Sequence, residues 1–173
     1  HGHKLTGEVD PLPNFPEELA KITWDITRKD ILEVLVPHMK SKGVETFGLI
    51  GFCWGPRIIA NLCAESDDFS VGVNIHRTWR AFAIHGEQPL EVAPKLKKAA
   101  QLYCVAGNDD DNYKEGGKFH NILKENLKEK FQYVYYPDMF HGWVNRAPKG
   151  EPEVLKAAND AIRRGVDFLK QNL

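Results

Sequence analysis

Cysteine is scarce in this 173-residue chain, which contains only Cys53, Cys63 and Cys104. Three cysteines cannot all pair within one chain, and none of these lies in a Cys-x-x-Cys motif. A secreted disulfide scaffold and a zinc ribbon are therefore both disfavoured. We expect a reducing environment for the protein, and hence a cytoplasmic location.

An excess of positive charge and a long hydrophobic run are also missing. The chain carries 23 Lys and Arg against 24 Asp and Glu, a net charge of −1, and has no basic stripe that could neutralise a run of phosphates. Its longest apolar run, residues 47–54, is far shorter than the roughly 20 residues of a membrane span. The first residues contain no signal-type apolar core. These absences disfavour nucleic acid and membranes as partners and indicate a soluble protein.

The composition is otherwise that of an ordinary globular protein. Hydrophobic residues make up 42% of the chain and charged residues 27%, a balance that excludes wholesale disorder. The length corresponds to one average domain, and no repeat, low-complexity segment or linker divides the chain. We expect a single domain over residues 1–173 that exists as a monomer or weak dimer.

Strand-like and helix-like segments alternate along the chain. Short apolar or β-branched runs predict strands at residues 44–51, 70–75, 101–106 and 131–136. Amphipathic spacing predicts helices at residues 17–42, 56–64, 117–130 and 151–173. This alternation is typical of a parallel α/β sheet. Three prolines predict an extended lead-in at residues 10–16. Residues 76–98 are expected to form a long, partly helical connection that covers a site.

The same spacing predicts which side chains the first and last helices bury. In the first helix the predicted buried face consists of Leu19, Ile22, Ile26, Leu32, Leu35 and Met39. In the last helix it consists of Leu155, Ala158, Ile162, Val166, Leu169 and Leu173. Each set would pack against the sheet.

The most informative motif is Gly51-Phe-Cys-Trp-Gly55, which lies between a predicted strand and a predicted helix. It has the form of a nucleophile elbow, in which glycines flank the reactive residue because the tight strand-to-helix turn leaves no room for side chains beside it. Cys53 would be the nucleophile, activated by the start of the helix, and the Trp54 amide would be an oxyanion donor. The alternative is that the glycines serve packing and Cys53 is an inert buried thiol. A phosphate-binding glycine loop is disfavoured because its signatures are missing.

A cysteine nucleophile of this type needs a histidine base and an acid that orients it, in the chain order nucleophile, acid, histidine. The run Asp109-Asp110-Asp111 follows one predicted strand, and His141 follows the next. An acidic run alone is usually a solvated turn, and a lone histidine is usually a surface residue. Together with the elbow, and in this order, they predict a catalytic triad.

Three motifs, Gly-Phe-Cys-Trp-Gly, Ala-Gly-Asn-Asp-Asp and Phe-His-Gly-Trp, resemble the motif regions of the dienelactone hydrolase family, a cysteine-using branch of the α/β hydrolases. The resemblance extends from the first helix to the end of the chain. It implies an α/β-hydrolase fold, with a mostly parallel sheet and helices on both faces. It also implies Cys53 as nucleophile, His141 as base and an acid among the three aspartates. Asp110 is preferred because its separation from His141 resembles the family's, and Asp109 is the main rival.

The chain departs from the family pattern at several positions. Pro56 replaces a second glycine after the elbow, which a first helical turn tolerates. The family often has His-Pro-Ser where this chain has His76-Arg77-Thr78, so His76 is a candidate for substrate binding. Arg146 lies near the position of a family arginine that can bind a substrate carboxylate, although it could equally be an ordinary exposed arginine.

The resemblance implies a hydrolase that cleaves a small-molecule ester or lactone through a Cys-His-Asp triad, with no metal or organic cofactor. Family members have several strands before the segment equivalent to His1-Gly-His3, so we expect the domain to lack its first strands. The alternatives are a non-catalytic domain that retains the elbow, and a redox-responsive thiol protein with Cys63 or Cys104 as the resolving partner. Metal binding by His1 and His3 is a weaker hypothesis.

Overall fold

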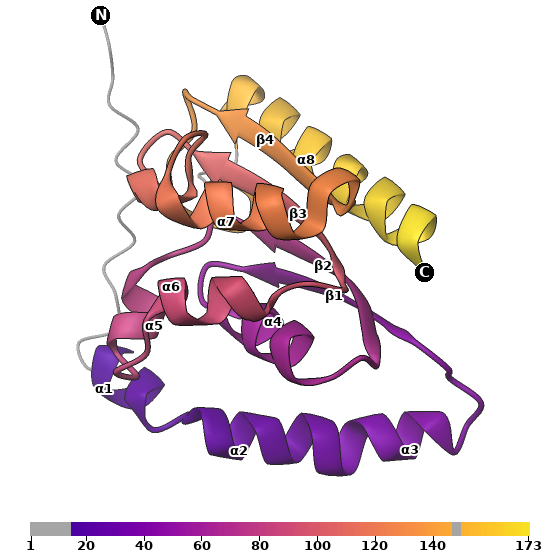
Figure 1. Ribbon diagram of the computed structural model, residues 1–173. Helices are drawn as coiled ribbons and strands as arrows, with labels where there is room; N and C mark the ends of the chain where they lie inside the picture. Colours follow the sequence, from indigo (N-terminus) through magenta and orange to yellow (C-terminus); the bar gives the residue numbers. More distant parts are fainter. Residues whose placement is uncertain (1–14, 147–149) are drawn as a thin grey trace, which may run out of the picture.

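The computed structural model describes residues 15–146 and 150–173, and the described chain is organised around one parallel sheet (Figure 1). Its four strands, β1 (Phe47–Phe52), β2 (Phe69–Ile75), β3 (Ala100–Ala106) and β4 (Phe131–Tyr136), lie side by side in the order β1-β2-β3-β4. Every neighbouring pair is parallel. Each connection must therefore cross from the end of one strand to the start of the next, and helical segments make these crossings.

Helices cover both faces of the sheet. The helices α4 (Gly55–Glu65) and α7 (Lys118–Leu127) pack into one hydrophobic cluster with Tyr103 and Val105 of β3. The long helix α8 (Pro152–Asn172) packs on the opposite face against alternate residues of β2 and β3. Figure 1 shows α7 and α8 on the two sides of the sheet. This arrangement confirms the predicted α/β-hydrolase fold class.

The remaining elements are short. The connection between β2 and β3 contains α5 (Arg80–Ala83), α6 (Pro89–Val92) and the 3-10 turn η2 (Ala93–Lys95), as expected for a partly helical segment. Two more 3-10 turns, η3 (Asp111–Tyr113) and η4 (Lys128–Lys130), flank α7. The predicted strands and the last three predicted helices are confirmed to within about three residues.

The first predicted helix is divided. The structure has α1 (Phe15–Ala20), a break, and then a continuous helical stretch formed by α2 (Trp24–Arg28), the π-helical η1 (Lys29–Leu35) and α3 (Val36–Lys40). Pro16 lies within α1, so the expected extended lead-in is wrong at that residue, and residues 10–14 lie outside the described chain.

The buried face predicted for this stretch is wrong at three of its six residues, while Leu19, Leu32 and Met39 are half-buried. Ile22, Ile26 and Leu35 are 44%, 51% and 51% exposed, whereas Val36 is buried. Ile22 lies in the break between α1 and α2. Leu35 ends the π-helical segment, whose i→i+5 hydrogen bonds rotate its side chains around the axis relative to an ideal α-helix. Pro37 also lacks the amide hydrogen that a regular α-helical bond would require.

The buried face predicted for the last helix is displaced by about one residue. Leu155, Val166 and Leu173 are exposed. The buried face of α8 consists of Val154, Ala158, Ala161, Gly165 and Phe168. Small residues let the helix lie close to the sheet: a Cβ at Gly165 would lie 3.0 Å from Val73 Cγ1. The larger Leu169 and Leu173 lie at the margin of this contact, beside Gly48 of β1.

None of the helices among the described residues combines the length and apolar character that crossing a membrane requires.

Candidate active site

The site lies at the carboxyl edge of the sheet, where four loops leave the four strands. Cys53 follows β1, His76 follows β2, Asp109 follows β3 and His141 lies in the turn region after β4. Since parallel strands end at the same edge, residues separated by nearly 90 positions meet there.

Cys53 occupies the strained turn that a nucleophile elbow requires. Its φ is +56°, which is uncommon for a residue with a side chain and is often associated with function. Its amide donates to the Ile75 carbonyl at 3.2 Å, and its carbonyl accepts from the Thr78 amide at 3.4 Å. These two bonds hold the Cys53 backbone against the end of β2.

The two glycines of the elbow differ in importance. A Cβ at Gly51 would lie 2.8 Å from the Gly55 carbonyl carbon and 2.9 Å from Ile59 Cδ1, so the turn leaves no room for a side chain there. A Cβ at Gly55 would meet nothing within 4 Å. The expectation that the tight turn requires glycine on both sides of the nucleophile therefore holds only for Gly51.

His141 connects the thiol to a carboxylate. Its Nε2 lies 3.2 Å from Cys53 Sγ, and its Nδ1 lies 3.1 Å from Asp109 Oδ1. The second oxygen of Asp109 accepts the Ala106 amide at 2.8 Å, and the Asp109 side chain is fully buried. The Asn108 side chain, which sequence reasoning missed, accepts the His141 amide at 2.6 Å. The described residues thus form a continuous chain from thiol to imidazole to carboxylate.

The preference for Asp110 over Asp109 is corrected by this geometry. Asp110 is exposed and caps η3, where its Oδ1 accepts from the Asn112 amide and the Asn112 side chain, each at 2.9 Å. The turn after β3, closed by the bond from the Asp109 amide to the Ala106 carbonyl, directs Asp109 inward and Asp110 outward. The only sequence signal for this was that Asp109 is nearer the strand end.

The electrostatics of the site favour a charge-separated pair. Burial alone would raise the pKa of the Cys53 thiol, but the hydrogen bond and charge of His141, with smaller effects of Arg146 and the Trp54 amide, lower it below its usual value. Burial alone would lower the pKa of His141, but its hydrogen bonds to Asp109 and Cys53 raise it to about 9. The arrangement therefore stabilises a thiolate beside an imidazolium.

Trp54 begins the helix that follows the nucleophile. Its amide hydrogen-bonds toward the Cys53 sulfur and thereby helps to lower the thiol pKa. Since α4 starts at the next residue, this amide belongs to the set of helix-terminal donors that lack intrahelical acceptors. The structure thus brings a donor without an intrahelical acceptor to the nucleophile, at the position expected for an oxyanion donor.

Arg146 lies close enough to the site for its charge to lower the pKa values of both Cys53 and His76. Its guanidinium packs on the backbone of Gly142, where a Cβ would lie 2.7 Å from Arg146 Nε. Gly142 has φ +95°, a backbone conformation that favours glycine. Arg146 itself remains exposed, which leaves its charge available to a bound molecule.

His76 does not line a pocket, in contrast to the expectation for substrate binding. Its side chain is fully buried behind His141, with the two ring centroids 5.0 Å apart and edge to face, and it also contacts Trp143. Burial and the charge of His141 lower the pKa of His76 to about 3. The residue therefore packs as a neutral ring against the base and cannot touch a substrate.

The other two cysteines are buried, and burial raises the pKa of each thiol to about 12. Such thiols are poor nucleophiles at neutral pH. No group of three or more potential metal ligands occurs within residues 15–146 and 150–173, and the histidines at positions 1 and 3 lie outside these ranges.

Comparisons with known proteins agree with the fold. A profile of the Dienelactone hydrolase family matches residues 16–173. The Carboxymethylenebutenolidase homologs of Homo sapiens and Pongo abelii are each 24% identical over 154 residues, which is 86% of this chain and 59% of theirs. The chain thus spans about three fifths of the length of these curated relatives. A crystal structure assigned to a dienelactone hydrolase of Klebsiella pneumoniae superposes with a TM-score of 0.68 at 17% identity, covering 92% of this chain and 67% of that one.

Proposed function

This chain belongs to the dienelactone hydrolase family, and from that premise we propose that the protein hydrolyses a small-molecule ester or lactone with Cys53 as nucleophile. The observation that carries the proposal is the chain of contacts in which His141 lies 3.2 Å from Cys53 Sγ and 3.1 Å from Asp109. An inert packing cysteine would need neither contact.

In the proposed first step, the Cys53 thiolate attacks the carbonyl carbon and forms a tetrahedral intermediate. The Trp54 amide donates to the developing oxyanion. Collapse of the intermediate breaks the bond to the leaving oxygen, which takes the proton from His141 Nε2, and an acyl-thioester remains on Cys53.

In the second step, a water molecule attacks the thioester carbonyl while His141 accepts its proton. Release of the acid restores the thiolate and the imidazolium. Asp109 holds the His141 ring in the required tautomer and stabilises its positive charge throughout both steps. The acid product carries the hydroxyl group from water. With an ester the alcohol leaves after the first step, whereas with a lactone the new hydroxyl group stays attached to the acyl chain.

We also propose that Arg146 binds a carboxylate on the substrate. Its exposure and the influence of its charge on Cys53 support this role. An anionic ester or lactone would then be preferred over a neutral one of the same size. A cytoplasmic location is proposed with this function, because the three cysteines are unpaired and a thiolate nucleophile needs a reducing compartment.

The test compares hydrolysis of p-nitrophenyl acetate by the protein with hydrolysis by Cys53→Ala and His141→Ala variants. Cys63→Ala is the matched control, because it removes a buried thiol outside the site. We expect both site variants to lose at least a hundredfold in kcat/KM and the control to keep most of the activity. Equal rates in all four proteins would eliminate the hydrolase proposal and favour a non-catalytic domain.

A further inference from the structure

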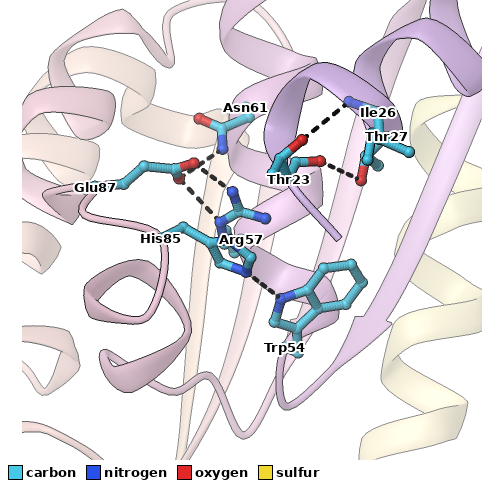
Figure 2. Close-up of polar contacts among 8 residues, drawn as sticks. All are labelled: Thr23, Ile26, Thr27, Trp54, Arg57, Asn61, His85 and Glu87. Atoms are coloured by element: carbon cyan, nitrogen blue, oxygen red, sulfur yellow. Dashed lines mark hydrogen bonds and ion pairs between the residues drawn. The ribbon is translucent and has the colours of Figure 1, made fainter. Parts of the chain in front are cut away.

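A polar cluster beside the nucleophile connects α4 to the loop between α5 and α6 (Figure 2). From α4 and its start come Trp54, Arg57 and Asn61, and from residues 84–88, which we call the 84–88 loop, come His85 and Glu87. None of these side chains touches the triad's reacting atoms. The cluster nevertheless contains the residue that directly follows Cys53.

The first link is an ion pair that attaches the loop to the helix. Arg57 is fully buried, and its Nε donates to Glu87 Oε2 at 3.0 Å while its Nη2 donates to Glu87 Oε1. The Asn61 side chain, one helical turn further on, also donates to Glu87 Oε2 at 3.1 Å. A buried guanidinium needs such a two-pronged carboxylate partner, so the position of Glu87 is strongly restricted.

The second link reaches the indole of Trp54. Its Nε1 donates to His85 Nε2 at 3.4 Å, and the Arg57 guanidinium lies over the indole with its Cζ 5.9 Å from the ring centroid. In Figure 2 the imidazole of His85 lies between the side chain of Glu87 and the indole nitrogen of Trp54. The bond requires a His85 ring whose Nε2 carries no proton. Burial, aided by the charge of Arg57 and opposed by that of Glu87, lowers the pKa of His85 and favours this neutral form.

We propose that His85 is a positioning residue of the active site: as an acceptor for the Trp54 indole, held in place by the Arg57–Glu87 pair, it fixes the Trp54 side chain beside the bound substrate. This inference rests on the proposed hydrolase function. The Trp54 ring is half-buried and adjoins the nucleophile, so its orientation shapes the space that an acyl group can enter. Without the acceptor, the indole keeps its packing against the hydrophobic cluster and the Arg57 cation above it, but loses the hydrogen bond that fixes its orientation.

The test uses His85→Phe, which keeps a ring and removes the acceptor, and His85→Gln, which keeps an acceptor oxygen. His38→Phe on the exposed face of α3 is the matched control. We expect His85→Phe to lower kcat/KM for p-nitrophenyl acetate about tenfold, and His85→Gln and His38→Phe to stay within about threefold of the unmodified protein. Alkylation of Cys53 by iodoacetamide at pH 7 should be equal in all of them, because the thiol, His141 and the backbone amide are unchanged.

A fluorescence titration tests the same contact without turnover. The difference between the emission of the protein and of Trp54→Phe isolates one of the four tryptophans. Because an imidazolium quenches a neighbouring indole, this emission should fall as His85 is protonated, with a midpoint below the usual histidine pKa. The transition should be missing in His85→Phe and His85→Gln.

The proposal is overturned if His85→Phe retains full kcat/KM, if His85→Gln is as impaired as His85→Phe, or if the titration persists without His85. Its failure is distinct from that of the proposed function. If hydrolysis by the unmodified protein equals that of Cys53→Ala, the hydrolase proposal fails, whereas the titration still decides whether His85 contacts Trp54.

Discussion

The variants Asp109→Asn and Asp110→Asn test which of the two neighbouring aspartates is the acid of the triad. Both substitutions remove one charge and keep the size of the side chain. Asp109 is buried and contacts His141 Nδ1 at 3.1 Å, whereas Asp110 is exposed and contacts only its own turn through Asn112. The pair therefore provides its own control.

The magnitude follows from the charge that Asp109 places beside His141. Two unit charges about 4 Å apart interact with about 4 kcal/mol at an effective dielectric constant near 20. This value is a ceiling for the loss of imidazolium stabilisation, and each 1.36 kcal/mol corresponds to a tenfold change in rate. We expect Asp109→Asn to lower kcat/KM roughly 100- to 1,000-fold, partly because an asparagine amide can also favour the wrong imidazole tautomer.

Asp110→Asn should change kcat/KM by less than about threefold, because asparagine caps a turn nearly as well as aspartate. The assay is hydrolysis of p-nitrophenyl acetate at pH 7, with circular dichroism to confirm that both variants are folded. If Asp110→Asn is as impaired as Asp109→Asn, or if Asp109→Asn is fully active, the assignment of the acid from this geometry is refuted.

Three further predictions follow from individual contacts. His141→Ala should slow alkylation of the nucleophilic thiol by iodoacetamide at pH 7 about 30-fold, because an ordinary thiol is only a few per cent ionised there; the deficit should shrink as pH rises toward 9. Gly51→Ala should destabilise the fold by about 2 kcal/mol in urea unfolding, whereas Gly55→Ala should be neutral. Asp160→Asn should lose about 1 kcal/mol at pH 7, and this difference should shrink as pH falls below about 4 and vanish only below about pH 2, because the Arg164 hydrogen bond lowers the pKa of Asp160 to about 2.

The two pH effects run in opposite directions: the stability difference at Asp160 is lost as pH falls, whereas the reactivity deficit of the thiol is lost as pH rises. The Asp160 carboxyl has a lowered pKa in the folded state, so its contribution is present above the unfolded value of about 3.9 and is lost as pH falls through about 2. A difference between the two proteins that is as large at pH 2 as at pH 7 would contradict this account. For the thiol, a His141→Ala variant that reacts as fast as the unmodified protein at pH 7 would show that His141 does not stabilise the thiolate.

Much of the fold and the site could be predicted from the sequence, because both depend on local patterns. Alternating apolar strands and amphipathic helices predict a parallel sheet, and residues that follow its strands must meet at one edge. Cys53 and His141 were found in this way, although 88 residues separate them. The glycine at position 51 was identified for the correct reason, since the turn excludes a side chain.

Tertiary structure alone decided which of several neighbouring residues faces inward. Asp109 and Asp110 are chemically identical and adjacent, and only the turn after β3 directs one toward His141. Similarly, α8 places its small residues on the sheet because close backbone approach improves packing, and His76 is buried because His141 and Trp143 cover it. Helical spacing predicts that a face exists, but the neighbouring surface determines which residues occupy it. The link from His85 to Trp54 belongs to the same class, since it joins a loop to a helix through contacts that no local pattern encodes.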